Sequence, residues 1–441
     1  MRHLFRWTVA LTLFAAIAFG ISWLIYMPNS QERGTWRAQA GGMIITLNPL
    51  RADVYRATSI SCIHQLSFPG HLKIVELAEG ASVKVVEGRL HLLIDSDLGS
   101  TVFDRIDALP ENCARANPDT ATPRETFDVM WTAMNEHYAF FDLHGVDWQA
   151  RHDLAPAADA QMSAEDLFEV FKMTLAGLDD GHVQLVADPL GYFSPALAPK
   201  WAQTAGLDRG ELTKIALENI ASPMTQIDGS LIEYALRDDG IGYILIPEMD
   251  IDNPLGVATG PATAQAFATV ADALVDTKAI IIDIRYNPGG NDAVSFGIAS
   301  HFIGKPTPAF SKSSRIGDTQ GPSFEAIVQP FDDTPLTQPV ILLTTRLTAS
   351  GAEIFTMAMR EIPQVIVMGE PTSGGLSDIL DFDLPNGWRL GLSDQTYLTP
   401  DGSLYEAIGI PPDIKVEIDA AALGRGEDPL LEFAIEQALG Q

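Results

Sequence analysis

The sequence is short of cysteines and of basic residues, and both shortages limit what the protein can do. Only Cys62 and Cys113 occur among 441 residues, and neither has a second ligand at metal-site spacing. The 28 lysines and arginines face 58 acidic residues, and this formal charge of −30 opposes binding to nucleic-acid phosphates. A glycine-rich phosphate loop and a His-Glu-x-x-His motif are also missing. We therefore expect no metal, no cofactor and no nucleic-acid partner.

The two cysteines leave one question open. In an oxidising compartment Cys62 and Cys113 could form a disulfide, and the loop that it closes would add about 4 kcal/mol in the chain-entropy model. Two separate buried thiols are an equal alternative, because the sequence gives no distance between the sulfur atoms.

The first 27 residues predict a membrane anchor. Arg2 and Arg6 precede an uncharged stretch, residues 7–27, which as a helix covers about 30 Å, the thickness of a bilayer core. The basic end stays in the cytoplasm, so residues 28–441 would lie outside it, on the periplasmic side. A cleaved signal peptide is the alternative, although no clear small-x-small cleavage site precedes Pro28.

Three regions are expected after the anchor. Short alternating apolar runs over residues 28–117 predict a small antiparallel β domain. Residues 118–200 predict a helical subdomain, with one helix capped by Thr122 and another capped by Ser163. Over residues 201–441, β-branched runs alternate with helical runs, which predicts a buried sheet covered by helices.

Two segments of this last region could carry chemistry. Ser350 follows a predicted buried strand and begins a helix, where free N–H groups favour developing negative charge. Taken alone, Ser350 could be only a helix cap, with Glu353 closing a capping box. Asn287-Pro288-Gly289-Gly290 ends another strand, and the N–H groups of Gly290 and Gly351 could together form an oxyanion hole.

Two further residues supply acid–base groups. His182 stands in Asp-Gly-His, where a helix gives way to a strand, and its side chain suits proton transfer near neutral pH. Glu406 precedes Gly-Ile-Pro-Pro-Asp. Either residue alone would be an ordinary structural histidine or surface acid.

Taken together, the segments resemble the tail-specific, or C-terminal processing, serine peptidases over about residues 120–420. The matching segments, in order, are residues 138–142, 180–182, 285–290, 348–353, 369–372 and 409–413. The resemblance implies an α/β, crotonase-like core (a ββα spiral), hydrolysis through an acyl-enzyme on Ser350, and a peptide or protein substrate. It gives no oligomeric state.

Two branches of that family use different bases. The serine-lysine branch carries a lysine where this chain has Gly375. The tricorn-like branch uses a histidine and a glutamate, at positions that correspond to His182 and Glu406, so the resemblance implies these as base and partner. A serine that precedes the base in the tricorn enzyme is replaced by Gly181, which leaves open whether Glu406 contacts the imidazole directly, through water, or with Asp180 sharing the role.

Proteins with the same core can have other functions, which are alternative hypotheses to a peptidase. Fewer than 60 residues separate Val186 from Tyr243, too few for the module that binds substrate C-termini in the serine-lysine peptidases. The main alternative is a non-catalytic protein that binds a retinoid-like small molecule or a peptide, and enoyl-CoA-type chemistry is a weaker one. The presence of serine, histidine, glutamate and both glycines favours the peptidase, which the fold alone would not.

Overall fold

The structure, a computed structural model, describes residues 25–72, 80–94, 97–116, 118–157, 161–251 and 259–440. The chain forms two compact units: Met1–Ile94 with Ser100–Ala116, and Asp95–Gly99 with Asn117–Gln441. The predicted membrane anchor, residues 7–27, lies outside the described residues except for its last three. Within the described ranges, no helix is both long enough and apolar enough to cross a bilayer.

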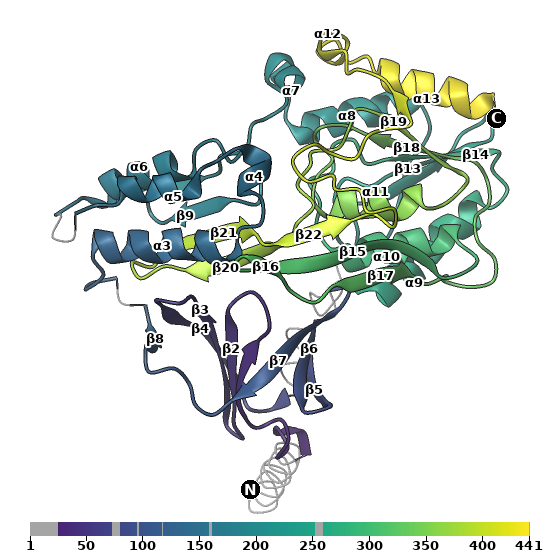
Figure 1. The fold of residues 1–441 in the computed structure, drawn as a ribbon. Coiled ribbons are helices and arrows are strands. Elements are labelled where there is room, and N and C mark those ends of the chain that lie inside the picture. The colour runs from purple at the N-terminus through teal and green to yellow at the C-terminus, as the bar shows by residue number, and fades with distance from the viewer. Residues whose placement is uncertain are drawn as a thin grey trace, which may run out of the picture. The chain divides into compact units, whose positions relative to one another are not determined.

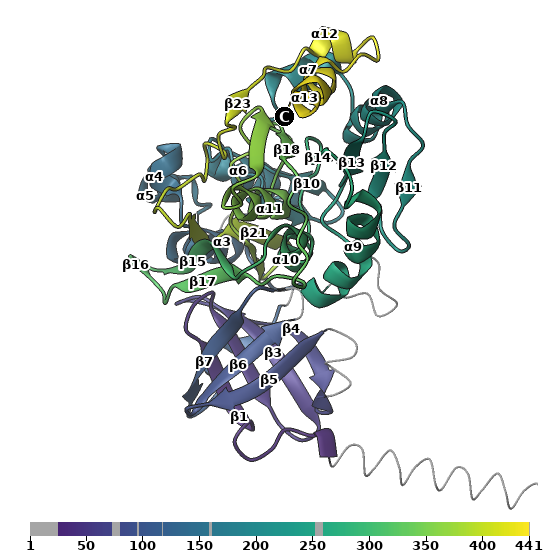
Figure 2. The same cartoon turned by 90° about the vertical axis from the view of Figure 1, so that its right-hand side faces the viewer.

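The first unit is an eight-stranded sheet in the order β5-β6-β7-β1-β2-β3-β4-β8 (Figure 2). Neighbouring strands are antiparallel except β4 and β8, which confirms the predicted antiparallel β architecture near the N-terminus. Trp36, Leu90 and Phe103 are fully buried in its core. The strands are β1 (Gly34–Ala38), β2 (Met43–Leu47), β3 (Arg51–Ala57), β4 (Cys62–Pro69), β5 (Ala81–Val86), β6 (Arg89–Ile94), β7 (Ser100–Ile106) and β8 (Cys113–Arg115).

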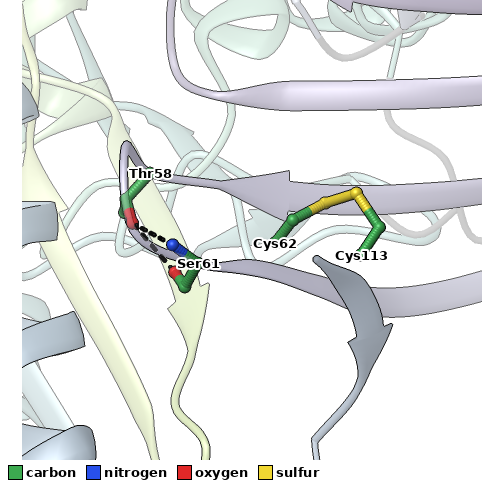
Figure 3. Close-up of a disulfide and its surroundings, with 4 residues drawn as sticks. All are labelled: Thr58, Ser61, Cys62 and Cys113. Carbon is green, nitrogen blue, oxygen red and sulfur yellow. Dashed lines mark hydrogen bonds between the residues drawn. A yellow bond between two sulfur atoms is a disulfide. The ribbon is translucent and has the colours of Figure 1, made fainter. Parts of the chain in front are cut away.

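The two cysteines of this unit are joined by a disulfide (Figure 3). Cys62 begins β4 and Cys113 begins β8, and the two residues are direct partners in the parallel pairing of these strands. The β3–β4 turn that precedes Cys62 is closed by Thr58 and Ser61, whose hydroxyl oxygens lie 2.9 Å apart. Of the two possibilities left open by the sequence, the structure has the bridge.

The centre of the second unit is a seven-stranded sheet in the order β11-β12-β13-β14-β18-β19-β23. The last five strands in this order run parallel to their neighbours, whereas β12 is antiparallel to β13. The strands are β11 (Thr225–Gln226), β12 (Glu233–Leu236), β13 (Ile241–Leu245), β14 (Ala279–Asp283), β18 (Val340–Thr344), β19 (Val365–Gly369) and β23 (Ile414–Lys415).

Helices cover both faces of this sheet, as predicted (Figure 1). Along β14, Ile280 and Ile282 pack among residues of α9 (Gly260–Leu274), α10 (Asp292–Ala299) and α11 (Gly351–Arg360). Ala279 and Ile281 point to the other face, toward α8 (Arg209–Ile220) and α13 (Pro429–Leu439). Because successive side chains of a strand alternate between faces, a strand covered on both faces is apolar throughout. The predicted mixed α/β fold is thus confirmed.

The predicted helix starts at Thr122 and Ser163 are also confirmed. The Thr122 hydroxyl accepts a hydrogen bond from Glu125 N, and the Ser163 hydroxyl accepts one from Asp166 N. These residues cap the first and last helices of a group formed by α3 (Pro123–His137), α4 (Phe141–His144), α5 (Trp148–Arg151), the 3-10 helix η1 (His152–Leu154) and α6 (Ala164–Leu175).

This helical group packs on a four-stranded sheet that joins distant parts of the chain. Its order is β10-β9-β21-β20, with β9 (Gln184–Ala187) and β10 (Gly191–Phe193) beside β20 (Ile379–Asp383) and β21 (Arg389–Ser393). Phe171 of α6 and Leu390 of β21 belong to the same buried cluster. The strand that follows His182 is therefore held by residues from the C-terminal third of the chain.

The remaining elements flank these two sheets. The strand β15 (Thr307–Ile316) pairs with β17 (Phe324–Val328), β22 (Gln395–Leu398) and β16 (Thr319–Gln320). Short helices complete the unit: α7 (Lys200–Ala205), η2 (Ser300–Phe302) and α12 (Ala420–Leu423).

Candidate active site

One cleft of the second unit brings together most of the residues that the sequence singled out. It has a volume of about 1240 Å³, and Ser350, His182, Gly290 and Gly375 are among its lining residues. These residues come from four segments: the start of α11, the loop before β9, the loop before α10 and the loop after β19. Glu406 is not one of the lining residues, although its neighbour Ala407 is.

Ser350 lies at the turn between β18 and α11, where the backbone is strained. Its φ is +53° and its ψ is −126°, a conformation that L-residues rarely adopt. The turn is fixed by two contacts to the neighbouring β14 loop, because Thr348 Oγ1 donates to Ile284 O at 2.9 Å and Ala349 N donates to Asn287 O at 3.1 Å. The serine side chain is thus presented at a helix N-terminus and is half-buried in the cleft wall.

The two glycines expected to donate to an oxyanion lie side by side. Neither Gly290 N nor Gly351 N donates to a protein acceptor within the described part of the chain. A Cβ added to Gly351 would lie 3.2 Å from Gly290 N, so the two backbones are in contact. Gly289 and Gly290 have φ values of +112° and +128°, which only glycine adopts without strain. Two unpaired donors beside a serine form a geometry suited to binding a negatively charged oxygen.

A buried carboxylate anchors this turn to the next loop. Glu353 accepts hydrogen bonds from Ser350 N at 3.0 Å, Gly374 N at 2.7 Å, Gly375 N at 2.9 Å and Thr372 Oγ1 at 2.6 Å. Burial raises the pKa of Glu353, and these four donors oppose that rise. The sequence suggested only a helix cap for this residue. The structure shows a clamp between the serine turn and the loop that carries Gly375.

His182 enters the cleft from a loop that is fixed by a second buried carboxylate. Asp180 accepts hydrogen bonds from His182 N at 2.8 Å, Tyr138 Oη at 3.0 Å and Ser393 Oγ at 3.1 Å. Burial and the Asp180 charge raise the pKa of Tyr138. A signal for this network is present in the sequence, because Tyr138 and Asp180 both stand in segments that matched the peptidase pattern. Their contact with each other, and with Ser393, could not be read from it.

The structure shows where the Glu406 carboxylate, proposed as partner of the imidazole, makes its hydrogen bonds. Glu406 Oε2 accepts from Leu376 N at 3.0 Å and Ser377 N at 3.2 Å, and no hydrogen bond to His182 is found among the described residues. Within the same residues, His182 Nδ1 is buried and has no partner. Burial, followed by the charges of Asp180 and Glu353, raises the pKa of Glu406 well above its usual range.

The cleft also contains two lysines, Lys200 and Lys415. The Lys415 side chain is 66% exposed, and its Nζ lies 3.5 Å from Glu417 Oε1. A lysine that acts as a base needs burial or a neighbouring cation to lose its proton near neutral pH, and an exposed lysine beside a carboxylate has neither. The described residues contain no group of histidine, cysteine or acidic side chains arranged to hold a metal ion.

Parts of the chain match known protein families and curated proteins. Residues 240–416 match the model of peptidase family S41, and residues 119–176 match that of the tricorn protease C1 domain. The carboxy-terminal processing protease CtpA of Bacillus subtilis is 25% identical over 228 residues, which are 49% of this chain and 46% of CtpA. A carboxyl-terminal-processing protease of Picosynechococcus is 32% identical over 160 residues, 35% of this chain and 37% of the relative. The chain thus spans less than half the length of these curated relatives.

Two solved structures have a similar fold. A candidate peptidase of Parabacteroides merdae superposes with a TM-score of 0.60 and 28% identity over 73% of this chain and 98% of its own. Mature CPAF has a TM-score of 0.52 at 13% identity and covers 72% of this chain and 98% of its own, a likeness of fold alone. The chain thus contains a peptidase family S41 domain over residues 240–416 and, ahead of it, a tricorn protease C1 domain over residues 119–176.

Proposed function

We propose that the protein is a serine-type peptidase that hydrolyses peptide bonds through an acyl-enzyme. One observation supports this above all: a strained serine at a helix N-terminus shares a cleft with Gly290 and a histidine, and Gly351 lies against Gly290. The N–H groups of both glycines have no acceptor among the described residues. Acyl transfer requires a nucleophile, a base and paired donors for the oxyanion, and each of these has a candidate here. No specific observation favours the alternative of binding without catalysis.

In the proposed reaction, Ser350 Oγ attacks the carbonyl carbon of the peptide bond while His182 takes the hydroxyl proton. The carbonyl oxygen becomes an oxyanion, to which Gly290 N and Gly351 N donate hydrogen bonds. His182 then gives the proton to the leaving amine, and the ester to Ser350 remains. Water, deprotonated by His182, hydrolyses this ester and restores the serine.

Glu406 is proposed to support the histidine as the third member of the catalytic group. Its carboxyl is buried beside the Asp180 network that holds the His182 backbone, as the effect of Asp180 on its pKa indicates. A carboxylate near an imidazole stabilises the imidazolium that forms during turnover. Since Gly181 replaces the serine of the tricorn enzyme, the connection runs through a water or a small movement of the side chains.

We further propose that the peptidase acts outside the cytoplasm, on the periplasmic side, and that residues 7–27 anchor it in the membrane. The uncharged length of this segment and the basic residues before it support this proposal. Fractionation of cells tests it, and a soluble form that begins near residue 28 would instead indicate a cleaved signal peptide.

The nucleophile is tested with a fluorophosphonate probe and the Ser350→Ala variant. We expect the probe to label Ser350 in the wild type, and the variant to lose labelling and peptide hydrolysis while its unfolding curve stays cooperative. Undiminished turnover of the purified variant would contradict the assignment. Thr356→Ala is not a suitable control, because its hydroxyl is buried and donates to Ala352 O. Ser403→Ala changes a serine outside the cleft lining and should keep full labelling.

A further inference from the structure

A second cavity, of about 370 Å³, adjoins the catalytic cleft at Gly290. Gly290 lines both hollows, and it is one of the two proposed oxyanion donors. The wall of the second cavity includes the segment from Glu248 to Asp250, the loop Gly290–Asp292 and Asp378. Any substrate carbonyl bound at Gly290 N therefore lies at the boundary of the two.

The position of this cavity relative to the proposed oxyanion donor is fixed by backbone hydrogen bonds. Met249 N donates to Gly289 O at 2.8 Å, and Asn291 N donates to Met249 O at 2.7 Å. A Cβ on Gly290 would lie 2.4 Å from Met249 O, so the two backbones are in direct contact. The segment that carries Glu248 and Asp250 therefore cannot move away from the oxyanion loop without breaking these bonds.

The cavity carries more negative charge than the protein neutralises. Glu248, Asp250, Asp292 and Asp378 all line it. Lys312 is the cation beside them, and its Nζ is already bonded to Asp378 Oδ2 at 2.8 Å and to the Tyr397 hydroxyl at 3.1 Å. No ion pair to Glu248, Asp250 or Asp292 is found among the residues that the structure describes.

Asp292 is partly buried, whereas Glu248 and Asp250 are exposed. Asp292 occupies the first position of α10, next to its cap Asn291, and its carboxylate accepts no hydrogen bond from any residue that the structure describes. Burial, followed by the charge of Asp378, raises the pKa of Asp292 to about 7. A partly buried acid that faces a cavity without a donor is a group that an entering cation would stabilise in its ionised form.

We propose that this cavity receives the side chain of a lysine or arginine on the amino side of the bond that is cut, and that Asp292 determines this preference. The inference rests on the proposed peptidase function. The carbonyl bound at Gly290 N belongs to the residue on the amino side of the cut bond, so the side chain of that residue is nearest to the cavity. A long stem with a cationic end suits a pocket whose far wall is acidic.

The preference should depend on pH, because a bound cation favours the ionised form of Asp292. The charged groups around Asp292 are Asp378, Lys312 and Asp97, with Glu248 and Asp250 on the same wall. As the pH rises through about 7, the fraction of ionised Asp292 in the free enzyme increases. Selectivity for a cationic side chain should increase over the same range.

The test compares peptides that differ only at the residue before the cut bond: lysine, or norleucine, which has a similar stem and no charge. In the wild type we expect kcat/KM for the lysine peptide to exceed that for norleucine by about tenfold or more. This ratio should increase between about pH 6 and pH 8. Asp292→Asn should bring the ratio close to one at every pH while the norleucine peptide is still cleaved. Asp276→Asn, an exposed acid at the end of α9, is the matched control and should leave the ratio unchanged.

The outcomes separate this inference from the proposed function. If Ser350 is labelled by the fluorophosphonate and norleucine is cleaved as well as lysine, the cavity does not select a cation and the inference fails. If Asp292→Asn keeps the lysine preference, Asp292 is not its cause, and the inference fails in the same way. If no peptide is cleaved and Ser350 is not labelled, the peptidase function itself fails. The wild-type comparison does not depend on whether a variant folds.

Discussion

Glutamine in place of Glu406 should stabilise the second unit and slow the reaction. The Glu406 carboxyl is buried, and burial together with the charges of Asp180 and Glu353 raises its pKa. An acid whose pKa is raised by folding supports the fold while it is protonated and weakens the fold once it is ionised. Leu376 N and Ser377 N both donate to the same oxygen, Oε2, so the single amide oxygen of glutamine can accept both hydrogen bonds.

The free energy of unfolding of Glu406→Gln at neutral pH should exceed that of the wild type by about 1–2 kcal/mol, the usual gain from relieving one unfavourable group. The melting temperature should rise by a few degrees. The difference should be small near pH 4, where the wild-type carboxyl is largely protonated both folded and unfolded. The difference in stability should increase as the pH rises above about 4.5, the ordinary pKa of a glutamate. It should reach its full size above the raised pKa of Glu406 in the folded state.

Urea unfolding at a series of pH values measures this difference, and turnover of a peptide substrate measures the catalytic cost. We expect kcat to fall by about 10- to 1000-fold, less than for loss of the histidine, because Glu406 makes no direct bond to the imidazole. Glu432→Gln, an exposed change on α13, is the control and should alter neither quantity. A stability gap that narrows as the pH rises would refute the argument from burial. Unchanged turnover would remove Glu406 from the catalytic group.

Two further predictions concern the base and the oxyanion loop. His182→Ala should reduce turnover by about 10³-fold or more, whereas Lys415→Ala should have little effect because that side chain is exposed. Turnover of both variants measured from about pH 5 to pH 9 decides this. An inactive Lys415→Ala variant together with an active His182→Ala variant would contradict the mechanism. Gly289→Ala should abolish activity and cost about 2–4 kcal/mol of stability, since its Cβ would lie 2.6 Å from Ser350 Cβ at a φ of +112°. Gly191→Ala, at a φ of +122° with nothing within 4 Å of its Cβ, carries the backbone strain alone and should retain turnover, so equal losses in both variants would contradict the steric argument.

The features that could be predicted from the sequence are those that depend on neighbouring residues. The caps at Thr122 and Ser163 follow from hydrogen bonds that span three residues. The strand that ends before Ser350 and the helix that begins after it are given by an apolar run followed by helical periodicity. The family pattern then identified the segments that carry the candidate catalytic residues. The structure places two of these residues, Ser350 and His182, in one cleft.

The features that could not be predicted depend on where distant side chains point. The sequence left open how Glu406 couples to His182, and in the structure its carboxylate accepts hydrogen bonds from Leu376 N and Ser377 N. No spacing rule specifies which of two nearby buried acids turns toward a histidine, and here Asp180 binds the His182 backbone. The acidic cavity at Asp292 was missed for the same reason, since its wall gathers residues from four separate segments.

The sheet that joins β9 to β21 has a consequence for the stage of synthesis at which the histidine loop folds. Leu185 is paired with Leu390, about 200 positions later in the chain, and Ser393 completes the hydrogen bonds of Asp180. During synthesis, the histidine loop therefore lacks these two contacts until most of the chain has left the ribosome. Contacts so far apart form late and slowly, because a long loop must close first. A truncated or still-growing chain could form the serine turn before the histidine loop has its strand partner. The complete site would therefore form only after synthesis had ended.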